Sequence, residues 1–69
     1  MKEEDILEKA KAKGLPTEKN QLTWKAAAIY LASKYSGEQT SIRALADKFG
    51  LTEVTIKNRV KELVSALRL

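Results

Sequence analysis

The spacing of apolar residues along the chain predicts four helices. Apolar positions recur at intervals of three and four residues in each segment, which is the period of one helix face. The second segment is apolar on nearly every side, so we expect it to be the buried centre of the domain. The expected fold is all-α, a single small domain spanning residues 1–69. The predicted helices cover about 3–13, 21–35, 42–49 and 53–67.

Residues that favour the start or the end of a helix stand at the ends of these segments. Ser41 precedes the third segment and Thr52 the fourth, and both side chains are preferred N-caps. We expect Asn20 to cap the second helix in the same way. Acidic residues crowd the first turn of the first helix and lysines crowd its last turn, which suits the helix dipole. Gly14 and Pro16 then end that helix.

The third and fourth predicted helices have the pattern of a helix-turn-helix motif. Ala46 stands where the two helices would cross and leaves no room for a larger side chain. Gly50 supplies the positive φ that the turn requires, without a Cβ clash. Leu51 is expected to fill the corner, and Ile56 to be buried one turn into the last helix. We predict a helix-turn-helix because cap, turn glycine, corner leucine and buried isoleucine agree.

The last predicted helix has an inward apolar stripe and an outward polar face. Val54 is the exception, since it is apolar and faces outward at the helix start. In a structural helix such a residue is unremarkable, whereas in a recognition helix it can contact a thymine methyl group. The expected stripe is Ile56, Val60, Leu63, Val64 and Leu67, and the expected outward face is Glu53, Val54, Lys57, Asn58 and Lys61.

Composition excludes several classes of function. The sequence contains no Cys and no His, which excludes disulfides, thiolate chemistry, the usual zinc sites and imidazole acid–base catalysis. We therefore expect no enzyme activity, no metal and no cofactor. No apolar run approaches the length of a membrane span, and the acidic start MKEED is unlike an export signal. We expect a cytoplasmic, nucleoid-associated protein that does not bind membranes.

The net charge of +4 is unevenly distributed. Residues 1–14 carry four basic and four acidic groups, whereas residues 43–69 carry six basic and three acidic groups, a net of +3. A phosphate-binding surface requires such an excess, and a solvated basic face explains it equally well. Trp24 and Tyr30 suit base stacking in principle. Their apolar helix favours a place in the core or against a partner protein.

Three longer stretches resemble a known family. They are AKAKGL at 10–15, AAAIYLAS at 26–33 and, most specifically, LTEVTIKNRVKEL at 51–63. The chain resembles, over roughly residues 6–67, the second cyclin-like repeat of archaeal transcription factor B, the relative of eukaryotic general transcription initiation factor IIB. In that family the repeat has five helices, and its final two form a helix-turn-helix that reads the B-recognition element beside the TATA box. The resemblance implies double-stranded DNA as a partner, with TATA-binding protein or another transcription protein as a second candidate.

The resemblance also implies site residues. Val54 corresponds to the family's base-contacting valine, and Lys57 stands where the family usually has an arginine that reaches the major groove. Lysine keeps the charge but lacks the planar fork that suits guanine, so we expect reduced sequence specificity. The residues expected to contact the DNA backbone or to support the recognition helix are Ser41, Arg43, Thr52, Thr55, Asn58, Arg59 and Lys61.

The chain is shorter than a complete initiation factor of that family. The zinc ribbon, the reader segment and the first cyclin-like repeat have no counterpart, and the 3–13 helix aligns with the second helix of the repeat. We therefore expect a partial cyclin-like repeat whose central helix is less covered near Trp24. This region is expected either to be more mobile or to form a weak homodimer, and the protein to be a monomer or a weak homodimer. Two alternatives to DNA binding are a protein-interaction module, which an exposed Trp24 would favour, and a minimal structural domain.

Overall fold

Four helices form all of the regular secondary structure in the computed structural model, which describes residues 2–68. They are α1 (Glu3–Ala12), α2 (Gln21–Tyr35), α3 (Ile42–Phe49) and α4 (Glu53–Leu67). The predicted all-α fold is confirmed, with one difference in bounds, because Lys13 is the C-cap of α1 and not its last residue. Met1 and Leu69, the ends of the expected domain, lie outside the described residues.

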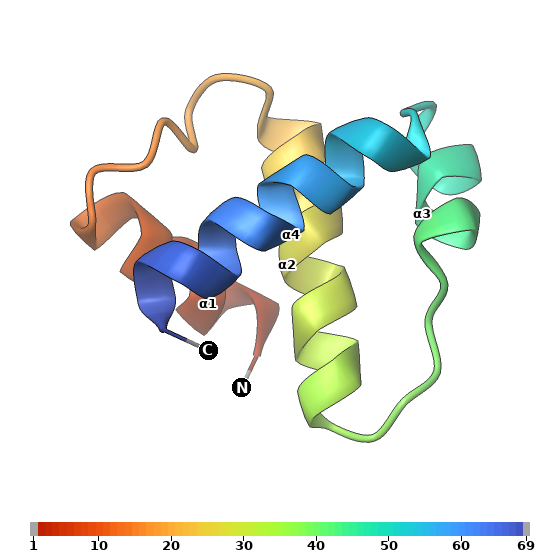
Figure 1. The fold of residues 1–69 in the computed structure, drawn as a ribbon, viewed down its shortest axis with the longest axis horizontal. Coiled ribbons are helices and arrows are strands. Elements are labelled where there is room, and N and C mark those ends of the chain that lie inside the picture. The colour runs from red at the N-terminus through yellow and green to blue at the C-terminus, as the bar shows by residue number, and fades with distance from the viewer. Residues whose placement is uncertain (1, 69) are drawn as a thin grey trace.

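The other helices are arranged around α2 (Figure 1). It packs against α1, α3 and α4, and α4 also packs against α1 and α3. In the view of Figure 1, α4 crosses α2, while α1 and α3 lie on opposite sides of it. The third and fourth helices form the predicted helix-turn-helix, with α3 on one side of the central helix and α4 across it.

Two hydrophobic clusters make up the core. The first joins α1, α2 and the C-terminal half of α4, and the second joins α2, α3 and the start of α4. Val60, in the middle of α4, packs against both clusters. The buried residues of the first are Ile6, Ala10, Trp24, Ala27, Ala28, Leu31 and Leu63, and those of the second are Ala26, Leu45, Ala46 and Ile56.

Consecutive small residues let α2 serve both clusters. Ala26, Ala27 and Ala28 are all fully buried; Ala26 belongs to the second cluster, and Ala27 and Ala28 belong to the first. Their methyl groups allow neighbouring helices to approach closely. The expectation that α2 is buried on nearly every side holds for its middle but not for its ends, since Leu22 and Tyr35 are about half exposed.

Trp24 is buried, contrary to the expectation that α2 is less covered there. The side chain is 2% exposed and lies in the first cluster with residues of α1 and α4. These two helices cover the indole ring without a further helix. The expectation of local mobility or dimerisation at Trp24 therefore loses its structural basis.

The predicted capping of α2 by the Asn20 side chain is also wrong. Asn20 has φ 54° and ψ 48°, in the left-handed region, and its side chain makes no capping hydrogen bond. Instead, the backbone carbonyl of Asn20 accepts hydrogen bonds from the N–H groups of Thr23 and Trp24. Asparagine tolerates the left-handed conformation better than most residues, so its role here is to turn the chain into the helix.

The packing of the alanines predicts that larger side chains will destabilise the fold. We expect Ala27→Leu to lower the free energy of unfolding by about 1–3 kcal/mol, because the extra carbons have no space in the first cluster. Ala12→Leu is the matched control at an exposed helical position, with an expected change within about 0.5 kcal/mol. Urea denaturation followed by circular dichroism measures both, and equal midpoints for the two variants would contradict the close packing.

Candidate nucleic-acid interface

Side-chain hydrogen bonds hold the starts of α3 and α4. The Ala44 N–H donates to Ser41 Oγ at 2.9 Å, and the Thr55 N–H donates to Thr52 Oγ1 at 3.3 Å. The hydroxyl oxygens of Thr52 and Thr55 also lie 2.6 Å apart and share a hydrogen bond. Both predicted N-caps are confirmed, and Thr55 is held by the cap that begins its helix.

A backbone hydrogen bond closes the turn between α3 and α4. Gly50 has φ 67° and ψ 36°, as the sequence predicted, and the Leu51 N–H donates to the Ala46 carbonyl oxygen at 2.9 Å. This bond is characteristic of a helix that ends in a left-handed residue. Leu51 packs against the second cluster, where Ala46 and Ile56 are buried. The angle between the two helices is therefore fixed by both the turn and the core.

One face of α4 is open to solvent from its first residue. At about 100° per residue, the five positions predicted to face outward fall within about 140° of the helix circumference. All five are exposed, and Val54 is 66% exposed although it is apolar. On the opposite side Ile56 and Leu63 are buried. The predicted division of this helix into inward and outward faces is confirmed.

Most basic side chains near this face are not neutralised. Within residues 2–68, Arg59–Glu62 is the one ion pair that involves the helix-turn-helix. The other exposed cations of this half have no carboxylate oxygen within 4.0 Å in the described chain. They include Arg43, Lys48, Lys57 and Lys61.

Arg59 contacts two side chains of its own domain, whereas among the other cations Lys48 lies over one ring, with its ammonium group 5.7 Å from the centroid of Phe49. The guanidinium carbon of Arg59 lies 5.4 Å from the centroid of the Trp24 ring, and its Nη1 donates to Glu62 Oε2. The side chain is 31% exposed. Of the two predicted roles for Arg59, the contacts favour support of α4 over a free phosphate contact. Arg59 and Glu62 are three residues apart on a helix, a spacing from which this ion pair could have been predicted.

The structure places the predicted site residues in two groups. One follows the cap and the first three turns of α4, and the other lies at the start of α3. Lys48, near the end of α3, is an exposed cation that the charge count included but the site prediction did not. The first group is Thr52, Val54, Thr55, Lys57, Asn58, Arg59 and Lys61, and the second is Ser41 and Arg43.

Fold and site together define a small helical domain with a helix-turn-helix whose second helix is exposed and basic. Residues 2–66 match the family model described as "Transcription factor TFIIB repeat". The chain belongs to this family of transcription factor TFIIB repeats. None of the helices described in residues 2–68 has the length and apolar character needed to cross a membrane.

Several curated proteins are similar over nearly the whole chain. Transcription initiation factor IIB 1 of Thermoplasma volcanium is 48% identical over 65 residues, which are 94% of this chain and 21% of that protein. Transcription initiation factor IIB of Methanopyrus kandleri is 44% identical over 66 residues, or 96% of this chain and 22% of that protein. The chain thus spans about a fifth of the length of these relatives. Their names are those of transcription factors, in agreement with the expectation of a non-enzymatic protein. No solved structure matches the chain significantly.

The contacts of Arg59 predict a specific loss of stability. Arg59→Met keeps much of the aliphatic stem but removes the charge over Trp24, so we expect unfolding to become easier by about 0.5–1 kcal/mol. Lys57→Met is the matched control on the exposed face, expected to change stability by less than about 0.5 kcal/mol. Thermal unfolding followed by the fluorescence of Trp24 measures both variants. If the two substitutions have the same effect, Arg59 does not stabilise the packing of α4 on α2.

Proposed function

We propose that the chain binds double-stranded DNA by placing α4 in the major groove. The observation that carries this proposal is the outward face of α4, which presents Val54 and Lys57 beside three further exposed residues, Glu53, Asn58 and Lys61. An α-helix fits the major groove of B-form DNA, which is about 12 Å wide. α3 packs behind α4 and holds it at a fixed angle, as in other helix-turn-helix domains.

Two side chains are proposed to contact base edges. Val54 and Lys57 are three residues apart, about 4.5 Å along the helix axis, so they suit neighbouring base pairs. The methyl groups of Val54 offer an apolar contact to a thymine methyl, and the ammonium group of Lys57 offers donors to the guanine acceptors. Because Lys57 lacks the planar fork of arginine, we expect it to discriminate between bases less sharply.

The remaining polar residues are proposed to hold the DNA backbone. Arg43 of α3 and Lys61 of α4 are exposed and not paired with a carboxylate in the described chain, and Asn58 is an exposed hydrogen-bond donor on α4. The caps Ser41 and Thr52 present the starts of two helices to phosphates. Affinity is then mainly electrostatic, and it falls as the salt concentration rises.

The preferred sequence and the partner follow from the family resemblance. The proposed site is the B-recognition element, with TATA-binding protein as a candidate partner on the same promoter. A single helix-turn-helix makes few contacts, so its specific affinity alone is expected to be modest. A protein-interaction role centred on an exposed Trp24 has no such support, because this side chain is buried.

The DNA-binding proposal predicts a measurable preference and a salt dependence. Fluorescence anisotropy compares a labelled duplex that carries the B-recognition element with a scrambled duplex, each over a series of salt concentrations. We expect tighter binding to the element and a linear fall of log affinity with log salt concentration. Absence of binding to both duplexes at low salt would refute the proposal.

Variants on α4 separate base contacts from charge. We expect Lys57→Ala to weaken binding to the element about tenfold and to reduce the preference over the scrambled duplex. Val54→Ala should reduce the preference without changing the salt dependence, because it removes no charge. Lys9→Ala, at an exposed position of α1, is the control and should bind like the parent. If both α4 variants also bind like the parent, α4 is not the recognition helix.

A further inference from the structure

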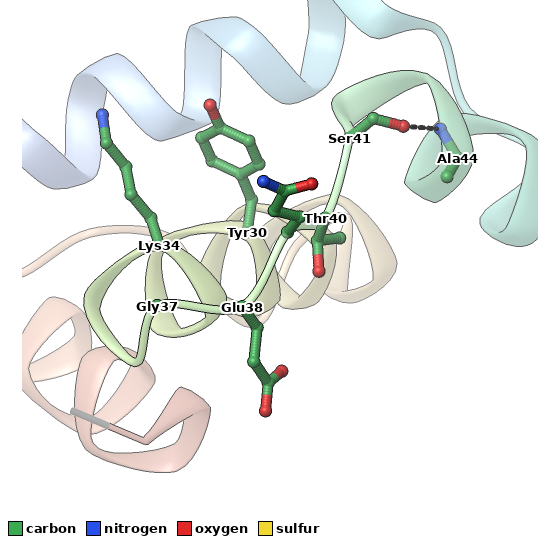
Figure 2. A pocket seen from close by; sticks show the side chains of 8 residues that line it. Tyr30, Lys34, Gly37, Glu38, Thr40, Ser41 and Ala44 are labelled. Atoms are coloured by element: carbon green, nitrogen blue, oxygen red, sulfur yellow. Dashed lines mark hydrogen bonds between the residues drawn. The ribbon is translucent and has the colours of Figure 1, made fainter.

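A concave surface lies next to the helix-turn-helix and shares the start of α3 with it. We call it the α2–α3 notch, formed by the C-terminal half of α2, residues 37–41 and the first turn of α3. Its volume is about 720 Å³. Figure 2 shows Tyr30 and Lys34 projecting from α2 on one side, with Ser41 and Ala44 of the α3 start nearby. The sequence prediction assigned no function to Lys34 or to residues 37–40.

The charge of the notch is positive on the side of Lys34. This side chain is exposed, and no carboxylate oxygen in residues 2–68 lies within 4.0 Å of its ammonium group. Glu38 is the acidic residue of the lining, and Figure 2 shows its carboxylate on the opposite side of the connector from Lys34 and Tyr30. An anion that approaches from the Lys34 side therefore meets a cation before it meets an acid.

Tyr30 adds a hydroxyl group on the same side of α2 as that cation. It lies one turn before Lys34 on α2, and the two side chains extend in the same direction from the helix (Figure 2). The Tyr30 ring packs against the second cluster, which holds it in place, while its hydroxyl has no hydrogen-bond partner in the described chain. A fixed hydroxyl donor and an ammonium group form a suitable pair for the oxygens of one phosphate.

The notch is connected to the proposed recognition helix through the second cluster. Tyr30 and Val60 pack against the same cluster, and Val60 is one turn after Lys57 on α4. α2 also packs directly against both α3 and α4. In homeodomains, a loop that precedes the helix-turn-helix contacts the DNA backbone while the recognition helix occupies the groove. The connector between α2 and α3 has the corresponding position here.

We propose that Lys34 and Tyr30 bind a backbone phosphate at the border of the major groove that α4 enters. This inference rests on the proposed DNA-binding function and extends its interface to α2. The ammonium group of Lys34 neutralises the phosphate, and the Tyr30 hydroxyl donates to one of its oxygens. Because a phosphate carries no sequence information, this contact fixes the orientation of the domain without changing base preference.

The test measures the salt dependence of binding for variants of α2. We expect Lys34→Ala to weaken binding to the element and to the scrambled duplex equally, by about three- to tenfold, and to reduce the slope of log affinity against log salt concentration by about 0.9. Tyr30→Phe keeps the packed ring and removes the hydroxyl, so it should weaken binding about two- to fivefold with the slope unchanged. Thermal unfolding of each variant shows whether it remains folded.

The matched control is Lys25→Ala. Lys25 is an exposed lysine of the same helix, nine residues before Lys34 and therefore about 180° around its axis. It carries the same charge but lies outside the notch. If Lys25→Ala and Lys34→Ala reduce the salt slope equally, only net charge matters and the notch is not a phosphate site.

The outcomes distinguish this inference from the function on which it rests. If Lys57→Ala weakens binding while Lys34→Ala and Tyr30→Phe bind like the parent, the notch proposal is overturned and the α4 proposal stands. If the parent binds neither duplex, both proposals are overturned. A duplex with one neutral methylphosphonate at the border of the groove should lose affinity with the parent but not with Lys34→Ala, and equal losses would also refute the contact.

Discussion

The close packing of α2 against the other three helices is the constraint on which the structure depends. Three consecutive alanines in the middle of this helix are fully buried, so neighbouring backbones approach it on more than one side. With about 67 described residues, the domain has no second layer that could compensate for a poor fit. The distance at which α4 packs against α2 therefore sets the position of α4, and with it the position of the proposed DNA-binding face.

Different faces of α4 have different roles. Its apolar stripe joins the two clusters through Val60, and one flank carries Arg59, whose guanidinium lies over Trp24. The remaining arc is exposed and carries the polar residues proposed to meet DNA. Because Arg59 packs on Trp24 and donates to Glu62, it has fewer free donors for a phosphate. In the proposed DNA complex, the electrostatic affinity therefore comes from Lys57, Lys61 and basic residues on other helices.

Local features of this fold were predictable from the sequence, and features that depend on distant residues were not. Ser41, Thr52 and Gly50 act within one turn of their own helices, so their residue types alone indicated their roles. Asn20 has two local options, a cap or a left-handed turn, and its sequence context does not distinguish them. The burial of Trp24 and its contact with Arg59 join residues 35 positions apart, which no periodicity reveals. The Lys34 side of the notch depends likewise on the path of residues 37–41.

Contacts away from α4 matter because a single helix in the groove does not fix the orientation of the domain. Contacts confined to one short segment of α4 would allow the domain to roll about the helix axis within the groove. Contacts to phosphates at the groove border remove that freedom, since they fix orientation while the bases specify sequence. Arg43 at the start of α3 and Lys34 at the end of α2 project from two different helices that both pack against α4. Because one core joins these helices, the positions of the two cations are fixed relative to Val54 and Lys57, the residues proposed to contact base edges.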